Sequence, residues 1–315
     1  MRVKKTMTIL LKTIGVIAIA IGLFLVIVFI VNRVCNKSEQ GKIEPYGQFV
    51  TVDGKNMNVT IQGKGEETVV LLPGYGTAAP ELDFKPLIEE LSPYYKVVAI
   101  EPFGYGLSDE TEKERTMDNI VSEIHQALQS LNIDRYILMG HSIAGIYGLD
   151  YVNKYKNEVS AFVGIDSSVP TQGGVDAEVP TTTFKLMKKS GLLRLLIKLQ
   201  GDPYASSDFD EKTKEQMRMI TNKNIYNDTT LNEMKNFTAN FDGAQQLSFP
   251  KTLPVIFFLQ ANNTDVEGWI PLHQEQIKDS VNGKVITLEG DHYLHHTRSK
   301  EIAEKFREFM GDIKK

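Results

Sequence analysis

Six short apolar runs, each ending in glycine or polar residues, constrain the fold of this chain more than any other feature. They cover residues 68–72, 97–100, 136–139, 161–165, 255–259 and 285–288. Continuous apolar runs of this length are typical of strands that are buried on both faces of a parallel sheet. Helical patterns separate most of them, at residues 84–91, 117–131, 143–155 and 269–281. The alternation predicts an α/β fold, with a mostly parallel central sheet and helices on both faces.

Two apolar segments further upstream flank a turn signal. Residues 49–52 and 57–61 lie on either side of Asp53-Gly54, which predicts an antiparallel hairpin at the sheet edge. In open α/β sheets, ligands bind beyond the carboxyl ends of the strands. Tyr75, Ser142 and Asp166 each follow such an end, so we expect the binding site there.

Ser142 lies between an apolar run and a helical pattern, within Gly140-His141-Ser142-Ile143-Ala144. A serine at a tight strand-to-helix turn exposes its hydroxyl, and the first amides of the helix point at the group that it attacks. Gly140 and Ala144 supply the small residues that such a turn requires, although the usual pattern has glycine in place of Ala144. The segment therefore predicts a nucleophilic serine.

Three further motifs surround the serine segment. They are Leu72-Pro73-Gly74-Tyr75-Gly76, Pro102-Phe103-Gly104-Tyr105-Gly106-Leu107-Ser108-Asp109 and Gly290-Asp291-His292. With the serine segment, these motifs make residues 45–315 similar to an α/β-hydrolase, and they follow one another in that family's order. The resemblance implies a hydrolytic site with a serine, an acid, a histidine and an oxyanion hole. It does not identify the substrate.

The resemblance implies that Ser142 is the nucleophile and that His292 is the base that accepts its proton. A carboxylate must hold the imidazole in one tautomer, and two candidates remain open. Asp166 ends an apolar run and precedes Ser167-Ser168-Val169-Pro170, a pattern similar to that of membrane-associated relatives. Asp265 lies after the run at 255–259, but its loop lacks the usual glycine and sets the acid one residue late. We favour Asp166.

The oxyanion hole implied by the resemblance consists of the backbone N–H groups of Tyr75 and Ile143, so the chemistry requires no metal or organic cofactor. Glu101 and His141 also lie near strand ends, and we expect them to pack or to form supporting hydrogen bonds. His295 and His296 are expected to cap or pack against a helix. A metal site is their alternative, but no matching acidic or cysteine set accompanies them in the sequence.

Residues 13–31 form an uncharged, nearly all-apolar run, which is long enough to cross a hydrocarbon layer of about 30 Å. Basic residues precede it at Arg2, Lys4, Lys5 and Lys12, and fewer follow it, at Arg33 and Lys37. This bias predicts a single-pass cell-membrane anchor with a cytoplasmic N-terminus and an extracytoplasmic hydrolase domain. A cleaved signal is the alternative, but residues 31–35 offer no small-x-small site and no lipoprotein pattern.

The predicted organisation is a stub and anchor at residues 1–35, a linker at 36–47, core segments at 48–169 and 251–315, and a helical cap insertion at 170–250. About 85 residues separate two strands at the insertion, which is more than a crossover needs. Within it, residues 184–199 combine leucines with lysines. We expect an amphipathic cap helix packed on the core, and contact with anionic lipid is the alternative.

The net charge of −5 leaves no basic footprint for a nucleic-acid partner, and the single cysteine, Cys35, excludes an internal disulfide. The sequence therefore predicts a membrane-anchored serine hydrolase that cleaves a small-molecule or lipid-like acyl ester. A peptidase or amidase remains open, with Glu178, Asp202 or Asp208 of the cap as partners for a substrate amine. An acyltransferase, or a catalytically silent binding module on the same fold, also remains open.

Overall fold

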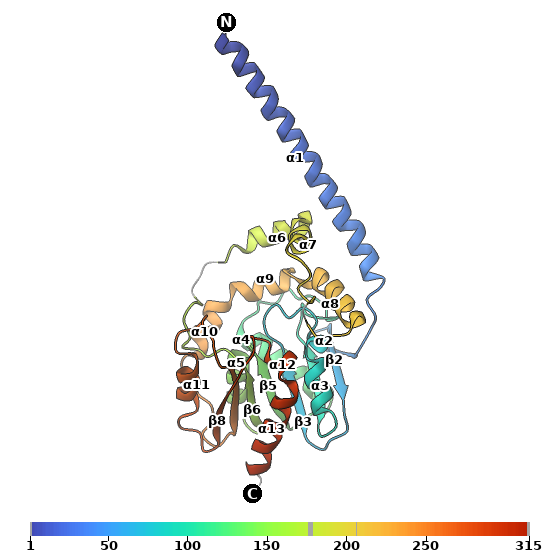
Figure 1. The fold of residues 1–315 in the computed structure, drawn as a ribbon. Coiled ribbons are helices and arrows are strands. Elements are labelled where there is room, and N and C mark those ends of the chain that lie inside the picture. The colour runs from blue at the N-terminus through green and yellow to red at the C-terminus, as the bar shows by residue number, and fades with distance from the viewer. Residues whose placement is uncertain (1, 176–178, 206, 314–315) are drawn as a thin grey trace.

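The computed structural model describes residues 2–175, 179–205 and 207–313, and an eight-stranded sheet lies at its centre (Figure 1). The strands are β1 (Gln48–Val52), β2 (Lys55–Gln62), β3 (Thr68–Leu72), β4 (Lys96–Glu101), β5 (Tyr136–His141), β6 (Val159–Ile165), β7 (Val255–Gln260) and β8 (Gly283–Leu288). Their order is β1-β2-β4-β3-β5-β6-β7-β8. Only β2 pairs antiparallel, with β1 and with β4, and the other pairs are parallel. The predicted α/β sheet and its edge hairpin are confirmed.

Side chains of the central strands alternate between two hydrophobic cores, one on each face of the sheet. In β3, Val70 and Leu72 belong to one core, whereas Val69 and Leu71 belong to the other. Successive side chains on a strand point to opposite faces, so a strand covered on both sides must be apolar throughout. This explains why the sequence shows continuous apolar runs.

Helices cover both faces of the sheet. One core packs against α4 (Met117–Ser130), α5 (Ala144–Lys154) and α11 (Trp269–Ile277). The other packs against α3 (Lys85–Leu91) and α13 (Ser299–Ile313), with the short α2 (Pro80–Asp83) and α12 (Leu294–Thr297) at its end. The helices α3, α4 and α5 lie where the sequence predicts them, whereas α11 ends at Ile277 rather than near residue 281.

The insertion between β6 and β7 is helical in its described part and lies over one end of the sheet (Figure 1). Its helices are α6 (Thr181–Ser190), α7 (Leu192–Gln200), α8 (Glu211–Asn224), α9 (Asp228–Lys235) and α10 (Phe237–Ala244). The expectation that residues 184–199 pack on the core is wrong: α6 buries no residue, α7 buries only Leu193, and both contact other helices instead.

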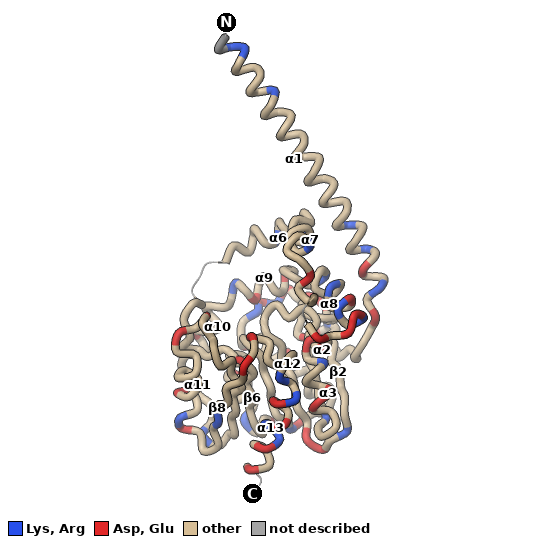
Figure 2. The backbone as a smooth tube through the Cα atoms, viewed as in Figure 1, with Lys and Arg blue, Asp and Glu red and all other residues tan. Residues whose placement is uncertain are grey.

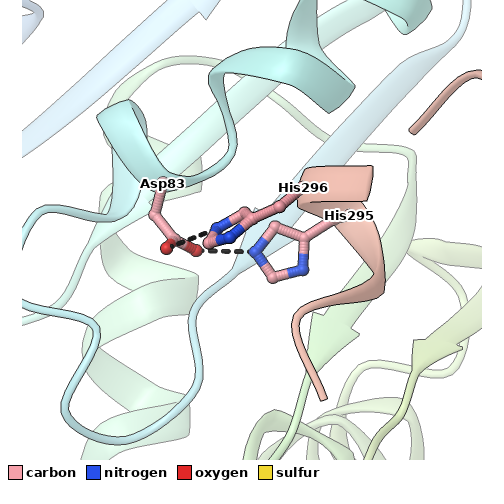
Figure 3. A group of neighbouring side chains, drawn as sticks. All are labelled: Asp83, His295 and His296. Carbon is pink, nitrogen blue, oxygen red and sulfur yellow. Dashed lines mark hydrogen bonds and ion pairs between the residues drawn. The ribbon is translucent and has the colours of Figure 1, made fainter. Parts of the chain in front are cut away.

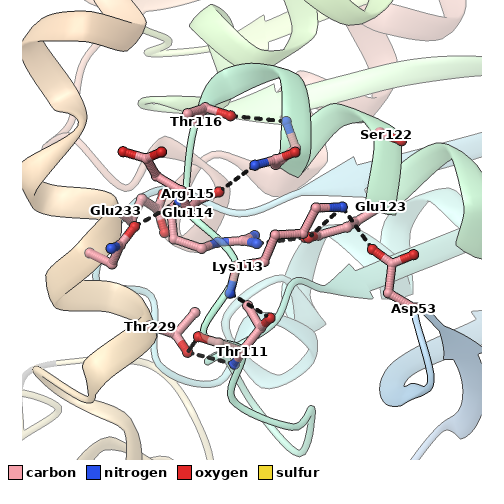
Figure 4. A network of polar contacts seen from close by, with 12 residues as sticks. Asp53, Thr111, Lys113, Glu114, Arg115, Thr116, Ser122, Glu123, Thr229 and Glu233 are labelled. Atoms are coloured by element: carbon pink, nitrogen blue, oxygen red, sulfur yellow. Dashed lines mark hydrogen bonds and ion pairs between the residues drawn. The ribbon is translucent and has the colours of Figure 1, made fainter.

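Buried polar contacts hold α9 on the core, and Figure 4 shows the one between Thr229 and Thr111. The Glu233 carboxylate accepts hydrogen bonds from the hydroxyls of Tyr105, at 2.8 Å, and Tyr147, at 2.7 Å. The Thr229 hydroxyl donates to the Thr111 carbonyl at 3.0 Å and accepts from its backbone N–H at 2.8 Å. Burial raises the pKa of Glu233. The polar residues Thr229, Thr230 and Glu233 of α9 are therefore buried against the core.

The helix α1 (Arg2–Gln40) projects away from the domain (Figure 1). Residues Lys4–Gln40 are long and apolar enough to cross a membrane, and none of the apolar stretch is buried. The helix continues through Gln40, so the segment expected as a linker from residue 36 is helical at its start. No glycine or proline interrupts residues 31–40, and Gly41 follows directly after the helix ends.

Gly148 of α5 tests the packing between helix and sheet, because a Cβ there would lie 2.3 Å from Cε2 of Phe162. We expect Gly148→Ala to lower the free energy of unfolding by about 1–3 kcal/mol through overpacking. Gly311 of α13 is the matched control, since no described heavy atom lies within 4 Å of a Cβ there. Gly311→Ala should raise stability by at most about 1 kcal/mol. Guanidinium denaturation in detergent measures both, and equal effects would contradict the packing argument.

Candidate active site

The turn between β5 and α5 places Ser142 in a strained backbone conformation. Its φ is +54°, in the left-handed region that non-glycine residues rarely adopt. A Cβ on Gly140 would lie 3.0 Å from the Cβ of Ala144, so the chain crosses itself closely on both sides of the serine. The tight strand-to-helix turn that the sequence predicts is therefore present.

Ser142 lines a cavity of about 610 Å³, together with Tyr75 and Ile143. The structure thus brings the predicted nucleophile and both predicted oxyanion residues to one site. The remaining wall comes from the segment after β6 and from the cap: Ser168, Gln172, Gly174, Val175, Val179, Met234, Lys235, Phe237, Thr238 and Phe241. The cavity therefore lies between the serine turn and the cap, as a substrate pocket would.

The His292 ring contacts the carboxylate of Asp166. Nδ1 lies 2.7 Å from Oδ2, and because a carboxylate only accepts, the Nδ1–H donates and leaves Nε2 able to accept a proton. Asp166 is completely buried, whereas the His292 side chain is 43% exposed. Asp265 is exposed, and its backbone N–H donates to the Asn263 side chain. The structure therefore places Asp166, and not Asp265, against the imidazole.

The second oxygen of Asp166 is also satisfied. Oδ1 accepts the backbone N–H of Gln260 at 2.9 Å and the indole N–H of Trp269 at 2.8 Å. Burying a carboxylate without such donors would be costly, so these contacts hold the ring-facing oxygen in place. The sequence reasoning assigned Trp269 only to the start of a helix. Its one available signal was that it is the single tryptophan of the chain.

His141 joins the serine turn to the loop that carries His292. Its Nε2 lies 3.1 Å from the His292 carbonyl oxygen, to which the Nε2–H donates. Burial lowers the pKa of His141 well below its ordinary value, and the charges of His295 and His292 add to the effect. A Cβ on Gly74 would lie 2.7 Å from His141 Nδ1 and 2.9 Å from Ser142 Cβ. The loop that carries Tyr75 therefore packs directly on the serine turn.

His295 and His296 share a partner that the sequence analysis missed, Asp83 (Figure 3). Their Nε2 atoms lie 2.6 and 2.8 Å from its two carboxylate oxygens. Burial would raise the pKa of Asp83, but the charge and hydrogen bond of His295, with those of His296, outweigh it and lower the pKa. These three residues place ligand-type atoms within 4.8 Å of one another, but the pairwise distances are those of hydrogen bonds. We interpret them as a packing cluster beneath the His292 loop.

Glu101 ends β4 and supports a neighbouring loop rather than the cavity. Its buried carboxylate accepts from the Tyr46 hydroxyl at 2.7 Å, the Asn58 amide at 3.0 Å and the Leu107 N–H at 2.7 Å. Burial raises the pKa of Glu101, although these donors oppose the shift. The contacts agree with the supporting role expected from the sequence.

The acidic residues considered for a substrate amine are not gathered at the cavity. Glu178 lies outside the described residues. Asp202 pairs with Arg218 at 2.5 Å, and Asp208 is exposed. Neither of these two is among the described residues that line the cavity, so the observed contacts give a peptidase no specific support.

The chain belongs to the α/β hydrolase fold family, which matches residues 67–248, more than half of the sequence. An uncharacterized protein of Bacillus subtilis (strain 168), YbdG, is 27% identical over 325 residues, and the match covers 98% of this chain and 100% of that protein. A 2-hydroxy-6-oxo-6-(2'-aminophenyl)hexa-2,4-dienoic acid hydrolase of Metapseudomonas resinovorans is 26% identical over 183 residues, covering 56% of this chain and 60% of the hydrolase.

Among solved structures, an epoxide hydrolase of Vigna radiata, VrEH1, superposes with a TM-score of 0.68 at 18% identity. The superposition covers 85% of this chain and 98% of that one. At this identity the likeness shows the fold alone. Family membership and the named relatives thus establish a hydrolase fold, and the choice of substrate and mechanism rests on the site.

The buried His141 gives stability a dependence on pH. The pKa of His141 is depressed in the folded state. As the pH falls below about 6.5, the imidazole of His141 therefore takes up a proton in the unfolded chain but not in the folded one. The contribution of the neutral His141 to the free energy of unfolding is therefore complete above that pH. Below it, this contribution is lost by at most about 1.4 kcal/mol per pH unit. We expect the stability difference between pH 7.5 and 5.5, measured by guanidinium denaturation, to shrink in His141→Gln. An unchanged difference would show that His141 does not titrate in this way.

Proposed function

We propose that this chain is a serine hydrolase that cleaves carboxylic esters through an acyl-enzyme. The observation that carries the proposal is the hydrogen bond between Asp166 and His292 Nδ1, in a loop tied to the turn of Ser142. A serine hydroxyl is a weak nucleophile until a neighbouring base accepts its proton, and a carboxylate-held imidazole is such a base.

In the proposed reaction, the Ser142 oxygen attacks the acyl carbon while His292 Nε2 accepts its proton. The backbone N–H groups of Tyr75 and Ile143 stabilise the negative charge on the carbonyl oxygen, a contribution of about 3–4 kcal/mol per donor in comparable sites. His292 then protonates the leaving alkoxide. Water, deprotonated by the same imidazole, releases the acid and restores the serine.

The substrate that we propose is a small-molecule or lipid-like acyl ester. The cavity wall offers Val175, Val179, Phe237 and Phe241 to an apolar chain, and Lys235 supplies a cationic group. Neighbours of this fold act on other electrophiles, and fold alone does not choose among them. A haloalkane dehalogenase mechanism needs a carboxylate nucleophile, which Ser142 does not supply.

We further propose that α1 anchors the enzyme in the cell membrane as a single span. The apolar run at residues 13–31 has the required length, and Lys4, Lys5 and Lys12 precede it. Basic residues are retained on the cytoplasmic side. We therefore propose that the N-terminus lies in the cytoplasm and the hydrolase domain outside.

Labelling with a fluorophosphonate probe tests the nucleophile. We expect the full-length chain to be labelled and Ser142→Ala to lose the labelling, because the probe reacts only with an activated serine oxygen. Ser108→Ala is the control, since that hydroxyl is buried and donates to the Glu101 carbonyl. Persistent labelling of Ser142→Ala would place the nucleophile elsewhere. Absence of both labelling and p-nitrophenyl ester turnover in the unmodified chain would favour the silent binding module.

Two matched asparagine substitutions test the acid. Asp166→Asn should lower kcat/KM for a p-nitrophenyl ester by about 10³–10⁴-fold, because the amide no longer holds the His292 tautomer that accepts the serine proton. Asp265→Asn should leave kcat/KM within about twofold, because that side chain is exposed and belongs to another loop. The reverse ranking would assign the acid to Asp265. Thermal melting of both variants checks that they remain folded.

A further inference from the structure

The helices α6 and α7 meet α1 at the end of its apolar run. Gly191, between the two helices, has a φ of +84°. A Cβ there would lie 2.6 Å from the Asn32 Cβ and 3.0 Å from the Val28 carbonyl oxygen, so only glycine permits this approach. The apolar run of α1 ends at Val31. If residues 13–31 cross the hydrocarbon layer, the turn between α6 and α7 must therefore lie at its boundary.

A side-chain clamp fixes this arrangement. Arg194 of α7 binds both carboxylate oxygens of Glu39 on α1, and its remaining donors reach the side-chain oxygens of Asn32, at 3.0 Å, and Asn36. Such a bidentate ion pair fixes the orientation of the two side chains as well as the distance between them. Three residues spaced along one side of α1 thus hold α7 beside the anchor.

The surface that this clamp holds in place is both apolar and basic. On α7, Leu196 and Leu199 share a face at i,i+3 and are 40% and 76% exposed. On α6, the exposed Leu186 and Lys189 are related in the same way. Exposed basic residues also include Lys198 on α7 and Arg33 and Lys37 on α1. Leucines flanked by lysines are the composition of helices that lie in a membrane interface.

The placement of these helices agrees with that composition. Figure 1 shows α6 and α7 on the side of the domain from which α1 projects, away from α13 at the opposite end. Figure 2 shows that the long middle of α1 carries no charge and that charged residues resume near α7. A leaflet beside α1 would cover these leucines and remove them from water.

We propose that α6 and α7, together with residues 28–37 of α1, form a docking surface for the membrane leaflet nearest the hydrolase domain. The partner is the anionic headgroups of that leaflet. The inference rests on the proposed membrane anchor. The exposed Leu186, Leu196 and Leu199 bury their side chains at the boundary of the headgroups and acyl chains, and the lysines attract the anionic headgroups.

Fluorescence quenching in vesicles tests the docking surface. Single cysteines replace Leu199, Val281 and Ile19 in a full-length Cys35→Ser background, and each carries an environment-sensitive fluorophore. Val281 is the matched control, since it is 74% exposed and lies at the other end of the molecule, beside β8. The vesicles contain phosphatidylglycerol, phosphatidylcholine and a lipid with a nitroxide high on its acyl chain. We expect several-fold stronger quenching at Leu199 than at Val281.

The Ile19 probe separates failure of the docking surface from failure of the anchor. Strong quenching at Ile19 with equal, weak quenching at Leu199 and Val281 would overturn the docking surface and leave the anchor standing. Weak quenching at Ile19 would overturn both. Fluorophosphonate labelling of the same samples reports separately on the proposed hydrolase site.

Charge reversal tests the headgroup component. Lys189→Glu with Lys198→Glu should lower quenching at Leu199 at least about twofold in phosphatidylglycerol vesicles, because each cation near an anionic leaflet contributes attraction. The matched pair Lys284→Glu with Lys300→Glu, exposed on the far part of the domain, should leave it unchanged. Equal quenching in both pairs would overturn the anionic partner. Thermal melting confirms that each variant is folded.

Discussion

The burial of the Asp166 carboxylate is the constraint on which the site depends. A charged group without solvent must be fully hydrogen-bonded, and here three elements supply the donors: the end of β7, the first residue of α11 and the loop of His292. Each donor comes from a different part of the chain, so the carboxylate can be accommodated only when the sheet and both flanking segments are in place. The imidazole orientation is thus a consequence of the fold rather than of its own loop.

The cap divides into two parts that are held by different interactions. The polar network around Glu233 and Thr229 fixes α9 to the core and so defines one wall of the cavity. By contrast, α7 packs beside α1 and is held there by Arg194, while α6 contacts both α1 and α9. One part of the insertion therefore shapes the pocket, and the other ties the domain to its apolar helix. This division links the proposed chemistry to the proposed membrane surface within one insertion.

Family membership and site geometry contribute different information. The match over residues 67–248 establishes a hydrolase fold, and the name of YbdG, whose match covers 98% of this chain, states no activity. Structural neighbours at low identity share the sheet and not necessarily the reaction. The proposed ester chemistry therefore rests on the cavity at Ser142 and on the contact between Asp166 and His292. The cavity wall contributed by the cap is the part that would distinguish one acyl substrate from another.

Local patterns in the sequence determined the elements: continuous apolar runs gave the buried strands, and Gly140 and Ala144 predicted the tight turn at Ser142. These signals are readable because backbone geometry and burial act on neighbouring residues. The contact of Asp166 with His292, the pairing of Asp83 with His295 and His296, and the contact of Arg194 with Glu39 were decided only by the tertiary structure. Each of these contacts joins residues far apart in the chain. The sequence around a polar side chain does not indicate which distant residue will be its hydrogen-bond partner.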